Sequence, residues 1–509
     1  MATDHTRLAR LQDSRLRLSL LLGSAILGVL AYPNINWHPV IWVSLVPVFV
    51  VALTRAPRQA FFDGWLHGVV FFALLLRWLD HTFRTYSTIP WPLTWLPIVA
   101  LAAYCGLYTA LVAAAVSWLC RRTGPRAGLA VAPFLWVAGE WVRGHFLSGF
   151  PWGLLGYSQA FALPVIQIAE WTGVYGVSFL VATANAWLAG ALSLGWRRAA
   201  GGLAAAAALL LVAVAVGWQA LAASAQGTLS VGVIQPSIDQ ARKWDSGVLT
   251  QTLEVYRRLT LEARPASPSL VVWPETAAPL FLRREPVVLR WLQALSGEVG
   301  TPILLGALDA EASARPYFNS AFFLTEQGIK AKYDKIHLVP FGEYVPLPWL
   351  LGVVRRWAEF ISELEAGTAR TVFPFGNTPF GVVICYEGLF PELFREFVGN
   401  GARFMVNMTN DAWFGETSGP WQHLAVLPLR AVENRVAIAR AANTGVSAII
   451  EPSGRLRRAL GLFERGVVAD RVAIRTRTTF YTRYGDVFAY ACLGLSFGAL
   501  GLAVLRRAG

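Results

Sequence analysis

The sequence predicts a membrane α-helical bundle of about eight spans joined to one water-exposed α/β domain. Three observations predict this architecture. Hydrophobic residues make up 55% of the 509 residues and charged residues only 15%, whereas soluble proteins average about 25% charged. Long apolar runs are confined to residues 1–225 and 486–505. Between them, short Val/Ile/Leu runs alternate with amphipathic stretches, as expected of a sheet covered by helices.

The bundle is defined by apolar runs near the length that a spanning helix needs, ~20 residues. These runs fall at residues 18–32, 38–54, 61–79, 92–120, 127–142, 163–195, 199–222 and 486–505. Arginines precede the first run, as they would precede the apolar core of a signal peptide. No small-residue cleavage site follows that run and six more runs come after it within residues 1–225, so we expect it to be retained as a span.

Arginine groups predict the orientation of the bundle, because cytoplasmic loops carry an excess of basic residues. The groups occupy alternate gaps between the runs and both tails, which places both termini in the cytoplasm and residues 226–484 on the outer side. They also account for much of the net charge of +13 without a nucleic-acid surface, so no nucleic-acid partner is expected. The groups are Arg7, Arg10, Arg15 and Arg17; Arg55 and Arg58; Arg121, Arg122 and Arg126; Arg197 and Arg198; and Arg506 and Arg507.

Several ionisable residues lie within or beside the spans, and two interpretations stay open for them. They form a polar pathway or headgroup site, or they pair between helices and reach toward the interface. We favour the second interpretation. The residues are Asp63, His67, Arg77, Glu140 and Arg143.

The chain is expected to divide into a seven-span domain at residues 1–225, a catalytic domain at 226–484 and a final helix at 485–509. The catalytic domain reads as α/β, and the amphipathic segment Leu249–Leu261 supplies one covering helix. Its strands are predicted at Leu229–Gln235, Leu270–Trp273, Pro302–Leu308, Phe318–Leu324, Gly381–Cys385, Phe404–Met408 and Val446–Ile450.

Three residues at or just after strands of this domain carry complementary chemistry: Glu275, Lys335 and Cys385. Taken singly, they could be a surface carboxylate, a solvated charge and a buried structural thiol. Taken together, they form an acyl-transfer site. A thiol attacks only as the thiolate, an ammonium stabilises that thiolate and the later oxyanion, and a carboxylate takes and returns the proton. No metal site is expected, because the 7 His are scattered and no Cys-x-x-Cys occurs.

These residues stand in motifs that resemble those of the nitrilase superfamily, in the same order along the chain. The motifs are Trp273-Pro274-Glu275, Lys335 and Cys385-Tyr386-Glu387, and Tyr317-Phe318-Asn319-Ser320 is similar to a further strand of that superfamily. The resemblance implies an αββα sandwich with a Glu275, Lys335 and Cys385 triad. Leu389 stands where many soluble members carry arginine, which argues against a small anionic amide as substrate.

Seven spans, such a domain and one final span are similar to the apolipoprotein N-acyltransferases of the bacterial inner membrane, over essentially the whole chain. Pro340–Pro346 and Asn410–Gly415 are similar to two loops of that family. The resemblance implies supporting or substrate-binding roles for Glu343, Tyr386, Glu387 and Trp244. Aromatic core packing is an equal alternative for Tyr386 and Trp244, and a structural salt bridge for Glu387; His337 and His423 are assigned to structure.

The reaction that the resemblance implies has two steps. Cys385 takes an acyl chain from a phospholipid, with phosphatidylethanolamine the expected donor, and the N-terminal amine of a diacylated apolipoprotein then attacks the thioester. No cofactor is expected. Two alternatives stay open: a membrane-anchored amidase or nitrilase with water as acceptor, and a non-catalytic membrane receptor or transporter. Leu347–Trp357, too apolar for an ordinary loop and too short to span, is expected to enter the outer leaflet; packing on the domain core is its alternative.

Overall fold

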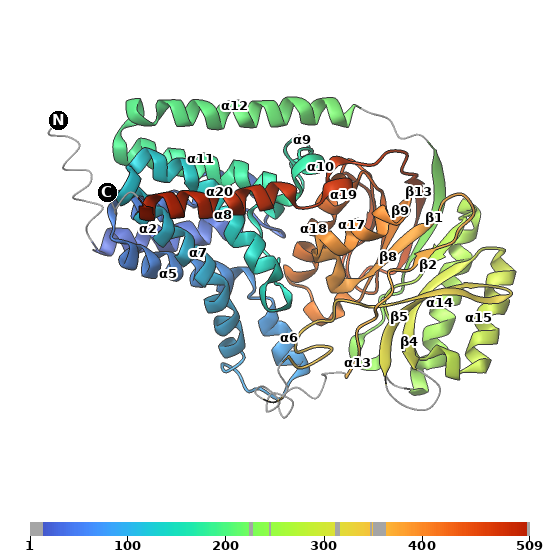
Figure 1. The fold of residues 1–509 in the computed structure, drawn as a ribbon. Coiled ribbons are helices and arrows are strands. Elements are labelled where there is room, and N and C mark those ends of the chain that lie inside the picture. The colour runs from blue at the N-terminus through green and yellow to red at the C-terminus, as the bar shows by residue number, and fades with distance from the viewer. Residues whose placement is uncertain are drawn as a thin grey trace. The chain divides into compact units, whose positions relative to one another are not determined.

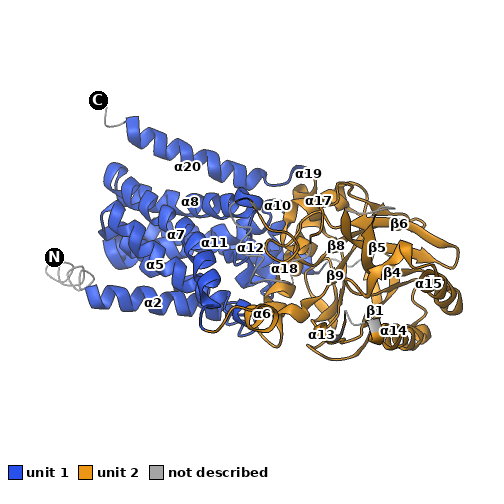
Figure 2. Cartoon of the chain, turned by 90° about the horizontal axis from the view of Figure 1, so that it is seen from below, with its two compact units in different colours: residues 1–80, 92–222, 484–509 blue, residues 81–91, 223–483 orange. Residues whose placement is uncertain are grey.

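The computed structural model describes residues 14–222, 227–243, 246–310, 316–346, 349 and 363–505. The chain folds into two compact units (Figure 2). Unit 1 comprises residues 1–80, 92–222 and 484–509, and unit 2 comprises residues 81–91 and 223–483. The short segment 81–91 therefore packs with unit 2, although the predicted first domain includes it. Trp244 and the predicted leaflet segment, apart from Trp349, lie outside the described residues.

Unit 1 is a bundle of apolar helices, and each predicted span coincides with a helical segment. Among the described residues, four helices, α7, α11, α12 and α20, are long and apolar enough to cross a membrane, or five if α5 and α6, bent by 56°, form one span. The described part of α2, the broken pair α3 and α4, and the less apolar α8 do not meet that test. The bounds are α2 Ser14–Leu30, α3 Ile41–Ser44, α4 Val46–Thr54, α5 Pro57–Leu75, α6 Leu79–Tyr86, α7 Trp95–Thr123, α8 Pro125–His145, α11 Val174–Leu194, α12 Trp196–Leu221 and α20 Val487–Leu505.

Glycine allows the tight connections between neighbouring helices. Gly124 joins α7 to α8 with φ +96°, and Gly195 joins α11 to α12 with φ +85°. Residues with a side chain rarely adopt such angles, whereas glycine does so at little cost. A single residue can therefore reverse the chain at these points, and each turn lies beside one of the predicted cytoplasmic arginine groups.

Three buried ionisable side chains of unit 1, those of Asp63, Glu140 and Arg143, have polar partners within the bundle, whereas neither ring nitrogen of buried His67 has a hydrogen-bond partner among the described residues. Asp63 Oδ2 forms ion pairs with Arg17 Nε and Arg55 Nε, at 3.3 and 3.5 Å. Glu140 accepts hydrogen bonds from the Trp136 side chain and a backbone N–H, and Arg143 donates to two backbone carbonyls. These contacts favour the structural interpretation of the intramembrane charges.

Unit 2 is an αββα sandwich, which confirms the predicted fold class (Figure 1). One seven-stranded sheet has the order β13-β1-β2-β4-β5-β6, with β3 pairing β4, and a six-stranded sheet has the order β12-β11-β10-β9-β8-β7. The strands are β1 Thr228–Gln235, β2 Leu270–Val272, β3 Ala278–Phe281, β4 Ile303–Ala310, β5 Tyr317–Thr325, β6 Gly328–Asp334, β7 Val372–Phe373, β8 Phe380–Ile384, β9 Phe404–Thr409, β10 Ile438–Ala442, β11 Ser447–Ile450, β12 Leu456–Leu460 and β13 Gly466–Ala473.

The helices of unit 2 cover the outer faces of the two sheets. Helices α14 (Leu249–Ala263) and α15 (Pro286–Val299) pack on the seven-stranded sheet, while α17 (Pro391–Gly399) and α18 (Gly419–Asn434) lie on the six-stranded one. The seven predicted strands are all present, with ends that shift by one or two residues. Parallel β8 and β9 are buried along their whole length, which is why their sequences are mostly apolar.

Candidate active site

Glu275 is placed by the tight turn that follows β2. Trp273 anchors this turn, because its buried ring stacks on Tyr256 at 4.4 Å and its Nε1 donates to Thr260 Oγ1 at 3.0 Å. Gly306 on β4 lets the turn approach closely: a Cβ there would stand 2.4 Å from the Thr276 nitrogen. The turn thus directs the Glu275 carboxylate toward the strand ends where the other site residues lie.

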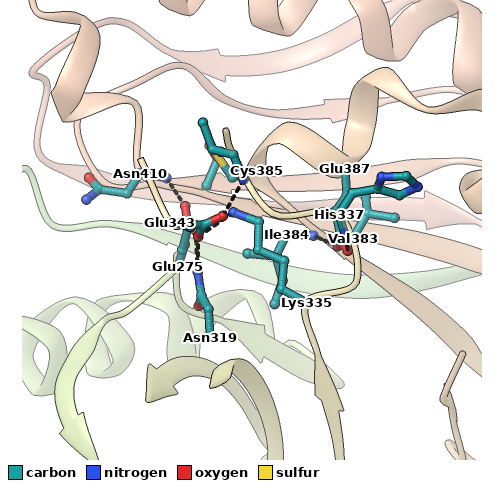
Figure 3. A network of polar contacts seen from close by, with 12 residues as sticks. Glu275, Asn319, Lys335, His337, Glu343, Val383, Ile384, Cys385, Glu387 and Asn410 are labelled. Carbon is teal, nitrogen blue, oxygen red and sulfur yellow. Dashed lines mark hydrogen bonds and ion pairs between the residues drawn. The ribbon is translucent and has the colours of Figure 1, made fainter. Parts of the chain in front are cut away.

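Lys335 follows β6 directly and lies between two carboxylates (Figure 3). Its Nζ is 2.8 Å from Glu343 Oε1 and 3.4 Å from Glu275 Oε1. Asn319 of β5 donates to both carboxylates, at 2.7 Å to Glu275 and 3.2 Å to Glu343. The Asn410 backbone N–H donates to the other Glu275 oxygen at 2.8 Å. The two glutamates are therefore fixed by hydrogen bonds as well as by the ammonium between them.

Cys385 begins the turn after β8, with a left-handed backbone at φ +53°. Glu387 holds this turn: its Oε2 accepts from the Ile384 N–H at 2.7 Å. Its Oε1 accepts from the N–H groups of Ile336 and His337, at 2.7 and 3.1 Å, and from the Tyr333 hydroxyl at 2.7 Å. Glu387 thus ties the strand end that carries Cys385 to the loop that carries Lys335.

A second buried network contacts the backbone of Cys385. His423 of α18 contacts the Cys385 carbonyl oxygen through Nε2 at 3.1 Å and Asp411 Oδ1 through Nδ1 at 2.9 Å. Arg440 of β10 donates to Asp411 Oδ2 at 2.6 Å, and Thr409 donates to Asp411 Oδ1 at 2.9 Å. Every charged member of this network is buried.

Burial and charge set opposite protonation states at the thiol and the ammonium. Burial raises the pKa of the Cys385 thiol well above its usual value, and the Glu275 carboxylate adds to the rise, while Lys335 opposes it. Burial alone would lower the pKa of Lys335, but Glu343 and Glu275 outweigh it and the net pKa is raised. The resting site therefore holds a neutral thiol beside a permanent cation, and the thiol needs a base to become a nucleophile.

Two family models match the chain: Apolipoprotein N-acyltransferase N-terminal domain over residues 24–187 and Carbon-nitrogen hydrolase over residues 205–479. An apolipoprotein N-acyltransferase of Geobacter metallireducens is 38% identical, and the match covers 95% of this chain and 94% of the relative. Relatives of the same name from Bradyrhizobium diazoefficiens and Pasteurella multocida are 33% and 30% identical, over 96% and 95% of this chain and 95% of each relative. The chain belongs to the apolipoprotein N-acyltransferase family.

Solved structures similar to this chain include an amidase from Nesterenkonia sp., with a TM-score of 0.38 and 19% identity, covering 53% of this chain and 97% of the amidase. A Saccharomyces cerevisiae member of the nitrilase superfamily has a TM-score of 0.37 and 19% identity, covering 49% of this chain and 93% of that protein. Family membership rests on the more similar relatives above. It confirms the predicted family, the acyltransferase class and a membrane protein.

In this member of the apolipoprotein N-acyltransferase family, the supporting residues differ in their contacts. Glu343 touches Lys335 directly, and its second oxygen accepts from the Val339 N–H at 2.8 Å. The Tyr386 ring packs edge-on against Phe390 at 5.1 Å. Glu387 is held by hydrogen bonds to N–H and O–H groups, so it clamps two segments of backbone.

Sequence reasoning did not select several residues that complete the site. Asn319 and Asn410 stood in motifs that resemble the family but received no role, although both bind Glu275. Lys243 is buried and its Nζ donates to the Glu275 carbonyl at 3.1 Å; burial lowers its pKa to about 8. Asn319 could have been found from its motif, whereas Lys243 lies 32 residues before Glu275 with no local signal.

Proposed function

We propose that this chain transfers an acyl chain from a membrane phospholipid, with phosphatidylethanolamine as the donor. The acceptor is the N-terminal α-amine of S-diacylglyceryl-cysteine in an apolipoprotein. The observation that carries the proposal is the buried Lys335 held between Glu275 and Glu343 beside Cys385, in a chain with membrane helices. Both substrates are lipids, which explains why a nitrilase-like domain is joined to a membrane bundle.

The first half-reaction forms a thioester. The Glu275 carboxylate accepts the Cys385 proton, and the thiolate attacks the ester carbonyl carbon of the phospholipid. Lys335 stabilises the resulting oxyanion. When that intermediate collapses, the carbon–oxygen bond of the ester breaks, and the lysophospholipid leaves as an alcohol with the proton that Glu275 had taken.

The second half-reaction removes the acyl group from Cys385 and regenerates the free thiol. The apolipoprotein amine attacks the thioester carbonyl, Glu275 takes the amine proton, and an amide bond replaces the carbon–sulfur bond. The thiolate leaves and regains its proton. A thioester keeps the acyl group at high transfer potential, so this sequence needs neither ATP nor a cofactor. Glu343 holds Lys335 in place through both steps, and we assign Trp244 to the substrate entrance.

The proposal is tested by separating the two half-reactions. Purified protein incubated with labelled phosphatidylethanolamine should gain one acyl mass on the peptide containing Cys385, and neutral hydroxylamine should remove it. Adding a diacylated lipopeptide should then move the label to the peptide amine. Cys385→Ala should abolish both, whereas Cys492→Ala, which changes a thiol in helix α20, should leave both intact. Acyl transfer by Cys385→Ala would overturn the mechanism, and free fatty acid as the product would favour the amidase.

We further propose that the protein lies in the bacterial inner membrane with both termini cytoplasmic and residues 226–484 periplasmic. The arginine groups beside the apolar helices support this orientation. Reporter fusions at residues 57, 124 and 198 should read cytoplasmic, and a fusion at residue 300 should read periplasmic. A cytoplasmic signal at residue 300 would refute the orientation and the role in lipoprotein maturation.

A further inference from the structure

Two of the described lysines are buried, and their surroundings differ. Lys335 is 1% exposed, and its ammonium lies between the carboxylates of Glu275 and Glu343. Lys243 is 4% exposed, yet among the described residues no carboxylate lies within ion-pair distance of its ammonium. Its Nζ donates instead to a neutral acceptor, the backbone carbonyl oxygen of Glu275, at 3.1 Å. Lys243 thus places a buried charge against one peptide group of the proposed general base.

A buried ammonium with one neutral hydrogen-bond partner lowers the stability of a fold. Burial lowers the pKa of Lys243 to about 8, and the Glu275 carboxylate opposes that fall. Because neutral pH lies below this value, the side chain is mainly charged there. An uncharged side chain of similar shape would avoid the cost of burying the charge. Such an exception to the rules of a stable core is typical of a functional residue.

The carbonyl that Lys243 binds belongs to a strained turn. Thr276, which follows Glu275, has a left-handed backbone at φ +48°. A residue with a side chain keeps this conformation only where its surroundings hold it. Gly306 leaves room on one side of the turn, because a Cβ there would stand 2.7 Å from the Pro274 carbonyl oxygen. The Lys243 ammonium binds the peptide group that joins Glu275 to Thr276, so it acts directly at the strained position.

The segment that carries Lys243 is also connected to the carboxylate of Glu275. Lys243 ends the short helix α13 (Gln240–Lys243). Asn410 Nδ2 donates to Gln240 Oε1 at 2.7 Å, and the Asn410 backbone N–H donates to Glu275 Oε2 at 2.8 Å (Figure 3). Helix α13 therefore reaches Glu275 by two routes, at its backbone through Lys243 and at its carboxylate through Asn410.

We propose that Lys243 is a positioning residue for the general base. Its ammonium holds the peptide group that follows Glu275, so that the carboxylate keeps the position from which it accepts the Cys385 proton. Lys243 acts through Glu275 and does not itself react. This inference rests on the proposed function in taking Glu275 as the base, and it concerns the rate of the chemical step and not the binding of lipid.

Replacing Lys243 with methionine separates positioning from stability. Methionine has a similar length but neither a charge nor an N–H group. At saturating phosphatidylethanolamine, we expect single-turnover labelling of Cys385 to slow by about 10- to 100-fold, since a small displacement of a catalytic group has effects of that order. The lipid concentration that gives half the maximal rate should not change. The melting temperature in detergent should stay near that of wild type, because the buried charge is removed together with its hydrogen bond.

Lys330→Met is the matched control for this substitution. The Lys330 ammonium is exposed and donates to Gln327 Oε1 at 2.8 Å, so this variant should label Cys385 at the wild-type rate. Lys243→Gln serves if Lys243→Met does not fold. The glutamine side chain is polar but uncharged and one bond shorter than lysine, so it should slow the labelling in the same direction.

The outcomes separate this inference from the proposed function. A folded Lys243 variant that labels Cys385 at the wild-type rate would overturn the inference and leave acyl transfer standing. A melting temperature that falls sharply together with the rate would also overturn it, because Lys243 would then be a structural residue. If wild type forms no Cys385 adduct with phosphatidylethanolamine, the proposed function fails instead. Alkylation of Cys385 by iodoacetamide then tests Lys243 alone, since a thiol reacts only after losing its proton. Slower alkylation in Lys243→Met would support the inference, and an equal rate would overturn it.

Discussion

The two charged clusters near Cys385 differ in composition and in exposure. The cluster of Lys335, Glu275 and Glu343 has two carboxylates, which are 8% and 12% exposed. The cluster of Arg440, Asp411 and His423 has one carboxylate, and its side chains are at most 1% exposed. The proposed reaction uses a carboxylate of the first cluster, Glu275, to exchange protons with substrate. The second cluster, called the closed cluster below, is shielded from solvent and held by short contacts. It can therefore affect only the backbone geometry and the electrostatic potential at Cys385.

This difference separates two tasks that are often assigned to one triad. Proton transfer requires a group whose charge changes during the reaction, and the proposed mechanism assigns that role to Glu275. Preorganised stabilisation requires charges that do not change, because reorganising them would raise the barrier. Variants in the two clusters should therefore fail in different ways.

The largest expected effect is on the stability of the closed cluster. Asp411→Asn leaves Arg440 buried without its counter-charge and removes a hydrogen-bond acceptor from His423, and breaking a buried pair costs about 3–5 kcal/mol. The melting temperature in detergent should fall sharply. Asp309→Asn is the matched control, because Asp309 is also buried but its partners Arg283 and Lys332 are 44% and 32% exposed. Equal losses of melting temperature in the two variants would show that the burial of the partners makes no difference.

The next largest effect is on the rate of thioester formation, through the cluster of Lys335, Glu275 and Glu343. Lys335→Ala removes the cation from the oxyanion, and losing one such donor costs ~10²–10³ in rate. Thioester formation from phospholipid should fall by that factor, measured by single-turnover labelling of Cys385. Lys332→Ala, which changes a partly exposed lysine three residues earlier on β6, should label at the wild-type rate. A Lys335→Ala rate within tenfold of wild type would remove Lys335 from the oxyanion role.

The smallest effect is the pH dependence of stability from Glu387. Burial raises its pKa to about 7, above the value of 4.5 expected in the unfolded chain. The folded state then binds the proton more tightly between these values, so the contribution to stability is complete below pH 4.5 and is lost as pH rises through 7. The advantage of wild type over Glu387→Gln in melting temperature should shrink by a few degrees from pH 5 to pH 7.5. A constant difference would show that Glu387 does not titrate there.

The sequence predicted the parts of the fold that continuous apolar runs encode, and missed those where charge interrupts the run. Strand β10 is buried throughout but contains Arg440, and β6 carries Lys330, Lys332 and Asp334, so neither read as a strand. The family motifs pointed to Glu275, Lys335 and Cys385, which the structure brings together. The closed cluster was missed and His423 was assigned to structure, because Asp411, His423 and Arg440 meet only through tertiary packing.

The span count shows the same limit in the bundle. Eight apolar runs are visible in the sequence, yet within the described part of the chain four or five helical segments are long and apolar enough by themselves. Pro47 lies where the second run breaks into α3 and α4, and α8 carries Glu140 and Arg143. Such helices owe their place to neighbours that satisfy their polar groups, which a hydropathy pattern does not record.

The hydrogen bonds of Glu387 to both strand ends have a consequence for the order in which the domain assembles during biosynthesis. Its carboxylate joins the end of β8 in the six-stranded sheet to the loop after β6 in the seven-stranded sheet. Before the second sheet has packed on the first, Glu387 has no hydrogen bonds to the loop after β6, and Lys335 does not lie beside Cys385. We therefore expect Cys385 of a nascent chain not to react with the surrounding lipid, even after the helices have inserted. The thiol becomes reactive when the two sheets pack together and bring Lys335 beside it.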